Sequence, residues 1–137
     1  MIVQLISVFI GVVGFAMVLE VQKKYLLYCG LAGMIGWAAY LLGQHCLPVG
    51  SVFFSSFCIA FLSQCFARLL RCPVTVFLIP GIYPSVPGAG IYRTVYYLIM
   101  GENRLSADYL LETLTTAGMI ALGIYIVDIF WKLRKRN

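Results

Sequence analysis

Charged side chains are scarce in this sequence. Lys, Arg, Asp and Glu make up 11% of its 137 residues, and histidine occurs once. Soluble domains carry about 25% charged and about 45–50% apolar residues, whereas 62% of this chain is hydrophobic and its mean hydropathy is +0.95. This composition excludes a soluble fold and a soluble catalytic domain. At about 20 residues per crossing, the length allows at most about six membrane-spanning helices.

Motifs that serve catalysis or metal binding are also missing. The sequence has no H-E-x-x-H, no G-x-S-x-G and no C-x-x-C, and its histidine, His45, falls in a short polar link between apolar runs. We interpret the cysteines as small packing residues, since free cysteine is commonly buried. We therefore expect no enzyme activity, metal or cofactor. The basic residues flank apolar runs and do not cover a polar face, so nucleic acid is not an expected partner.

Five apolar stretches predict an all-α membrane protein that forms a single integral membrane domain, residues 1–137. Their ranges are about 2–19, 25–42, 49–67, 73–100 and 115–131. The fourth stretch is long for one crossing and short for two. We predict five transmembrane helices, or four if the fourth stretch is re-entrant. Residues 105–114, which precede the last stretch, form either an interfacial helix or the outer turns of that span.

Basic residues determine the predicted orientation. Eight of them follow the first, third and fifth stretches, and all fall on one side of the membrane if the fourth stretch crosses once. They are Lys23, Lys24, Arg68, Arg71, Lys132, Arg134, Lys135 and Arg136. Cytoplasmic loops are enriched in Lys and Arg. The N-terminus is therefore expected outside the cell and the C-terminus in the cytoplasm.

Proline and glycine concentrate in the fourth stretch, which holds four of the five prolines. Proline removes a backbone donor and clashes with the preceding turn. We therefore expect half-helices at about 73–79 and 91–100, separated by an unwound stretch from Pro80 to Gly90. Unwound backbone at membrane depth is tolerated where protein buries it or where it lines a cavity. Half-helix N-termini in transporters face anionic groups, which favours a small carboxylate-bearing substrate. The alternative is a kinked helix or a tight turn without a ligand.

Arg93 is the one charged residue between Val74 and Gly101. An ionisable side chain within the membrane usually faces the bundle interior or a cavity, so Arg93 is a candidate partner for a substrate carboxylate. The alternative is that its long side chain reaches the outer interface, because it lies close to the end of the stretch.

Two acids lie at the cytoplasmic ends of apolar runs. Glu20 follows the first run and Asp128 lies near the end of the last. A carboxylate in a low-dielectric setting can take up a proton, so both are candidates for coupling transport to protons. The alternative is that they pair with the neighbouring Lys23 and Lys132.

Small residues recur on two of the runs. Gly30, Gly33 and Gly36 follow one another on the second, and Ala117 and Ala121 form a pair on the last. Small residues allow helices to approach closely in lipid. The pattern fits either packing within the chain or a homo-oligomer.

The stretch L-I-P-G-I-Y-P-S-V-P-G-A-G-I-Y-R, residues 78–93, resembles the C-terminal membrane domain of the threonine/serine exporter family. The stretch G-F-A-M-V-L-E-V, residues 14–21, is similar to the family's N-terminal signature. Together with the charge argument above, the resemblance indicates a candidate substrate pathway. Its members are Pro80, Gly81, Pro84, Pro87, Gly88, Gly90, Tyr92 and Arg93.

The resemblance also implies a function and a partner. The family occurs as one long chain or as two chains, and this sequence is similar to the small one over its whole length. It is therefore expected to work in the lipid bilayer of a bacterial cytoplasmic (inner) membrane with a separately encoded larger membrane subunit. Such proteins resemble secondary exporters of threonine and serine, or of small dicarboxylates such as succinate. The alternative is an accessory or scaffolding subunit that stabilises the larger partner without contacting substrate.

Overall fold

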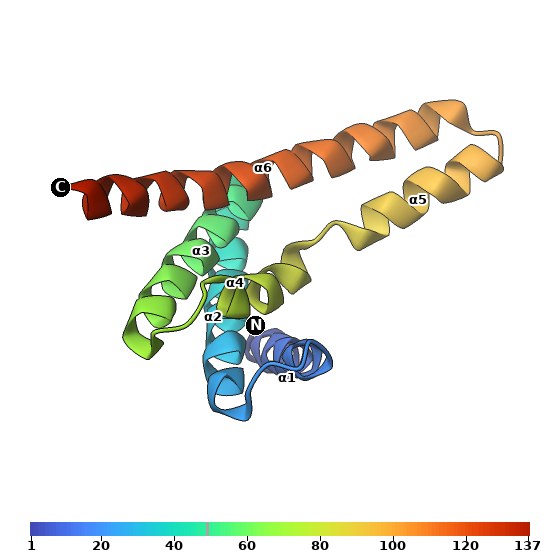
Figure 1. The fold of residues 1–137 in the computed structure, drawn as a ribbon. Coiled ribbons are helices and arrows are strands. Elements are labelled where there is room, and N and C mark those ends of the chain that lie inside the picture. The colour runs from blue at the N-terminus through green and yellow to red at the C-terminus, as the bar shows by residue number, and fades with distance from the viewer. Residues whose placement is uncertain (49) are drawn as a thin grey trace.

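The computed structural model describes residues 1–48 and 50–137. These residues form six α-helices and one 3-10 turn, and they contain no β-strand (Figure 1). The elements are α1 (Ile2–Val18), α2 (Lys23–Cys46), α3 (Gly50–Leu70), α4 (Thr75–Ile82), η1 (Tyr83–Ser85), α5 (Gly88–Ile99) and α6 (Asn103–Arg136). The predicted all-α membrane fold is confirmed. The predicted start of the third span, residue 49, lies outside the described residues.

Three of the described helices are long and apolar enough to cross a membrane, namely α2, α3 and α6. Helix α1 has 17 residues, and α4 with η1 forms a shorter apolar segment. Because a crossing takes about 17–25 residues, α1 lies at the lower limit. The count of five spans stays a prediction.

Helices α1, α3 and α4 pack around α2, and each of them contacts it. Gly33 lies against the side chain of Val12 on α1, and Gly36 lies against Ile59 on α3, so that a Cβ at either glycine would overlap its neighbour. Gly30 faces α1 in the same way. The recurring glycines of the second predicted span therefore serve close packing within the chain.

Helix α6 packs along α3 and runs in the same direction. Gly123 lies where a Cβ would come within 3.0 Å of the Phe53 carbonyl oxygen, near the start of α3. Farther along, Trp131 contacts Arg68, near the end of α3. The two helices therefore finish at the same end of the molecule, which we call the basic end because it carries Arg68 and Arg134.

The other half of α6 forms a hairpin with α5 that extends away from the remaining helices (Figure 1). The Ser106 hydroxyl donates to the Thr94 carbonyl at 2.8 Å, and the rings of Tyr97 and Tyr109 stack 5.4 Å apart. The predicted lead-in 105–114 is continuous with the last span. It forms the outer turns of that helix and not a separate interfacial helix.

Candidate functional site

The chain is discontinuous between α4 and α5, as the proline content predicts. After η1, Val86 is extended with ψ 128°, and α5 then begins at Gly88 with Pro87 as its N-cap. The irregular backbone is shorter than predicted. It covers about 83–87, whereas the sequence favours an unwound stretch from Pro80 to Gly90.

The prediction that α4 ends before Pro80 is wrong, because the helix continues through Pro80 and Gly81 to Ile82. Proline lacks an N–H, so Pro80 leaves the carbonyl of Val76, four residues earlier, without its helical donor. The thiol of Cys29 on α2 donates to that carbonyl, with Sγ 3.3 Å from the oxygen. A neighbouring helix therefore satisfies the group that the proline frees.

A pocket of about 200 Å³ opens beside the break. Side chains from α2, α3, the break and α6 line it, namely Trp37, Tyr40, Val52, Pro84, Ser85, Pro87 and Thr116. None of the described residues that line it is charged. Because Pro87 both lines the pocket and caps α5, the positive end of the α5 dipole lies at the pocket.

Two of the residues that line the pocket have a hydrogen-bond donor to spare. The indole N–H of Trp37 is buried and finds no acceptor among the described residues. The oxygen of Tyr40 accepts a hydrogen bond from Gln44 Nε2 at 2.8 Å, which leaves the Tyr40 hydroxyl hydrogen free to donate. Donors of this kind fit a ligand that presents carboxylate oxygens.

A buried serine connects the break to the helix bundle. Ser55 on α3 is fully buried, and its hydroxyl donates to the Gly36 carbonyl on α2 at 2.8 Å. The same oxygen lies 3.5 Å from Ser85 Oγ. Ser85 is thereby held against α2 and α3 at the pocket wall.

The structure separates the predicted pathway residues into three groups. Pro84 and Pro87 line the pocket. Pro80 and Gly81 are buried in the core instead, where a Cβ on Gly81 would come within 2.9 Å of Ile59 Cγ2. The remaining residues lie on α5 and do not line the pocket; they are Gly88, Gly90, Tyr92 and Arg93.

Arg93 lies on the exposed surface of α5. Its guanidinium carbon is 5.5 Å from the centre of the Tyr109 ring on α6. Tyr92 is also exposed and stacks on Tyr96. Contact of Arg93 with substrate stays a prediction, and the stacking on Tyr109 accounts for its position without one.

The two candidate coupling acids lie away from the pocket. Asp128 pairs with Lys132, with 2.8 Å between Oδ2 and Nζ, and also accepts from Gln64 Nε2 at 3.5 Å. The hydrogen bond to Asp128 raises the pKa of the Lys132 ammonium. Glu20 is exposed in the turn after α1, with φ 58°. A role of either acid in proton coupling stays a prediction.

Sequence reasoning missed the polar residues of the pocket. Trp37 and Tyr40 lie one turn apart on α2, whereas Thr116 lies on α6. No local sequence pattern connects the two helices. Ser85 falls inside the proline-rich stretch, in which only the prolines and glycines were predicted as pathway residues. Its position between two prolines was the available clue.

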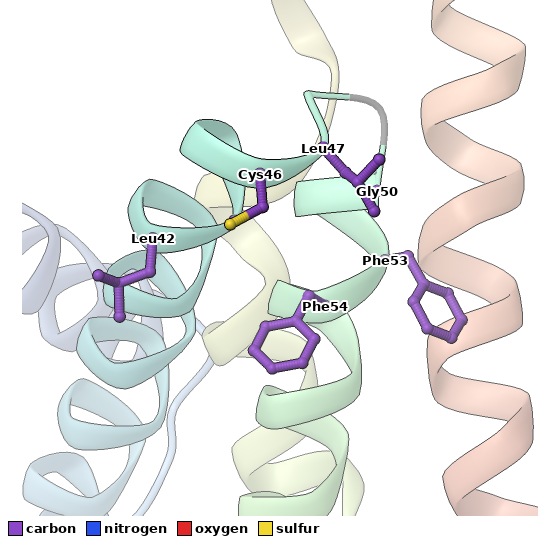
Figure 2. Close-up of a pocket in the computed structure, with 7 residues that line it drawn as sticks. Leu42, Cys46, Leu47, Gly50, Phe53 and Phe54 are labelled. Carbon is purple, nitrogen blue, oxygen red and sulfur yellow. The ribbon is translucent and has the colours of Figure 1, made fainter.

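A second pocket, of about 430 Å³, lies where α2 and α3 meet at the end opposite the basic end (Figure 2). Leu42, Cys46, Leu47, Phe53 and Phe54 contribute to its wall. These side chains offer no strong hydrogen-bonding group to orient a polar substrate. The pocket beside the break is therefore the better candidate.

Comparison with known proteins relates this chain to a family of transporters. A family model described as "Threonine/Serine exporter, ThrE" matches residues 4–130. A curated protein of Corynebacterium glutamicum named "Threonine/serine exporter" is 26% identical over 122 residues, which cover 88% of this chain and 24% of that protein. This chain thus spans about a quarter of the length of that relative. No solved structure matches it.

Proposed function

This chain belongs to the threonine/serine exporter family, and from that premise we propose that it is the small subunit of a two-component secondary exporter. Its substrates are threonine and serine or small dicarboxylates such as succinate, which leave a bacterial cell through the cytoplasmic membrane. The match covers 24% of the curated relative, so most of that relative has no counterpart in this chain. We propose that a separately encoded larger membrane subunit of the same family supplies that part.

The pocket beside the break is the observation that carries this proposal. Trp37 and Tyr40 bring hydrogen-bond donors to an irregular segment, and irregular backbone at membrane depth is tolerated where it lines a cavity. In a low-dielectric setting these donors interact more strongly with a carboxylate than they do in water. The pocket therefore suits the carboxylate of a small substrate.

The absence of charge among the described lining residues favours amino acids over dicarboxylates. A zwitterion carries its own ammonium group, whereas a dianion needs a compensating cation, because burying unpaired charge is costly. Threonine and serine therefore match the pocket that the residues of this chain form. Export of a dicarboxylate requires a basic residue from the larger subunit.

The accessory-subunit alternative rests on a different part of the molecule. No residue of α5 is buried, and large apolar side chains are exposed along it, among them Ile91, Val95 and Ile99. This face is suited to contact with a larger membrane partner. In that case the partner alone holds the substrate.

Reconstituted efflux distinguishes the two functions. Vesicles containing both subunits are loaded with radiolabelled threonine or succinate, and Tyr40→Phe is compared with Tyr125→Phe, which alters an exposed tyrosine of α6 outside the pocket. A hydrogen bond to a charged group contributes about 1.5–3 kcal/mol, so Tyr40→Phe should lower threonine efflux at limiting substrate roughly tenfold or more.

Co-purification of the two subunits shows whether each variant still assembles. Unchanged efflux by the Tyr40→Phe complex would favour the accessory subunit. Efflux from vesicles that hold this chain alone would contradict the two-component proposal.

A further inference from the structure

At the basic end, two guanidinium groups from different helices meet one indole ring. The guanidinium carbon of Arg68 on α3 lies 4.0 Å from the centre of the Trp131 ring, and that of Arg134 on α6 lies 5.5 Å from it. Both arginines are exposed. The arrangement brings two permanent positive charges to one indole ring at the end of two predicted spans.

No carboxylate neutralises these charges within the described chain. The one ion pair found among residues 1–48 and 50–137 joins Asp128 to Lys132. The indole N–H of Trp131 is buried and has no partner in the same part of the chain. Two positive charges that no carboxylate of the described chain offsets provide a site at which an anion would be stabilised.

An apolar groove adjoins this cluster between α3 and α6. It has a volume of about 260 Å³ and is lined by Phe57, Phe61, Ile126, Val127 and Phe130. The rings of Phe61 and Phe130 lie 6.1 and 6.3 Å from that of Trp131, centre to centre. The groove therefore leads along the helix seam to the two arginines.

We infer that this seam binds an anionic phospholipid, with its phosphate bound by Arg68 and Arg134 and an acyl chain in the apolar groove. The planar guanidinium group matches phosphate oxygens with paired hydrogen bonds. Tryptophan and arginine at the end of a span lie at the depth of the lipid headgroups. A free phosphate would use the cations alone, whereas a phospholipid uses both parts of the site.

Quenching of Trp131 fluorescence tests the inference. The chain has two tryptophans, so a Trp37→Phe background leaves Trp131 as the sole emitter. The full chain is placed in phosphatidylcholine vesicles in which an equal fraction of lipid is replaced by acyl-brominated phosphatidylglycerol or by acyl-brominated phosphatidylcholine. Each basic residue near a membrane surface favours anionic lipid by about 1 kcal/mol, so the two arginines predict a preference of roughly thirtyfold for phosphatidylglycerol.

Matched double variants separate a specific site from general surface charge. Arg68→Gln with Arg134→Gln should lose the preference, whereas Arg71→Gln with Lys135→Gln removes the same charge from the same end and should keep most of it. If circular dichroism shows that the Arg68→Gln with Arg134→Gln protein has lost helicity, Arg68→Lys with Arg134→Lys is used in its place. That pair retains the charge without the planar fork, and it should retain part of the preference.

Three results would overturn the inference. Equal quenching by the two brominated lipids in the Trp37→Phe protein would show that no anionic lipid is preferred, and it requires no arginine variant. An equal loss of the phosphatidylglycerol preference in both Gln double variants would show that the preference comes only from general surface charge. Reversal of the quenching by inorganic phosphate at constant ionic strength would indicate a site for the phosphate group alone.

Discussion

The thiol of Cys29 on α2 donates a hydrogen bond to the carbonyl oxygen of Val76 on α4, 3.3 Å away. That carbonyl is the one that Pro80 leaves without a helical donor. Helix α4 therefore continues past the proline and brings Gly81 against Ile59 of α3. The break begins one turn later, where Ser85 reaches the pocket.

This relationship predicts the stability of Cys29 variants. Cys29→Ala leaves the partly buried Val76 carbonyl without its donor, which should lower the free energy of unfolding by about 1 kcal/mol. Cys29→Ser retains a donor and should lose less. Cys46→Ala is the control, because Cys46 is exposed. Unfolding in mixed detergent micelles measures all three, and a Cys29→Ala protein as stable as the parent would contradict the assignment.

Gly36 should tolerate no side chain. A Cβ there would overlap the side chain of Ile59, and the Gly36 carbonyl also accepts the Ser55 hydrogen bond. Overpacking typically costs about 1–3 kcal/mol, so Gly36→Ala should unfold at lower denaturant concentration. Gly118→Ala is the matched control, since nothing lies within 4 Å of its added Cβ. Gly118→Ala should unfold at the same denaturant concentration as the parent protein or at a higher one, because alanine favours helix. Equal behaviour of the two variants would show that α2 and α3 do not approach as described.

The position of Arg93 predicts a small effect on transport. Its side chain stacks on Tyr109 and does not line the pocket. An exposed cation–π contact contributes about 0.5–1 kcal/mol, so Arg93→Ala should lower the stability of the α5–α6 hairpin slightly and leave efflux close to that of the parent. The measurement is threonine efflux from vesicles that contain both subunits. Lost efflux with normal assembly would restore Arg93 as a substrate contact.

The pair between Asp128 and Lys132 predicts little dependence of stability on pH near neutrality. The pKa of Lys132 is raised in the folded protein, so the ammonium form stabilises the fold below its unfolded pKa, about 10.4. That stabilisation is lost only as pH rises through the higher folded value. Thermal unfolding between pH 6 and about pH 8 should therefore change equally for Asp128→Asn and the parent. An efflux profile that loses its pH dependence in Asp128→Asn would instead support proton coupling by Asp128.

Composition and local backbone chemistry determined much of the fold. An 11% charged share cannot cover a soluble surface, so the class of all-α membrane protein follows from the sequence. Pro87 ends the helical run, because proline disfavours helical backbone in the residue before it, and Val86 is extended. The discontinuity between α4 and α5 could therefore be predicted without a structure.

The tertiary structure decided the features that depend on partners distant in the chain. Pro80 remains helical because Cys29, 47 positions from Val76, supplies the donor. The pocket exists because α2, α6 and the break converge on it, and Arg68 meets Trp131 because α3 and α6 run in parallel. Each depends on how helices pack, and a packing register is not encoded in the spacing of residues within any single helix.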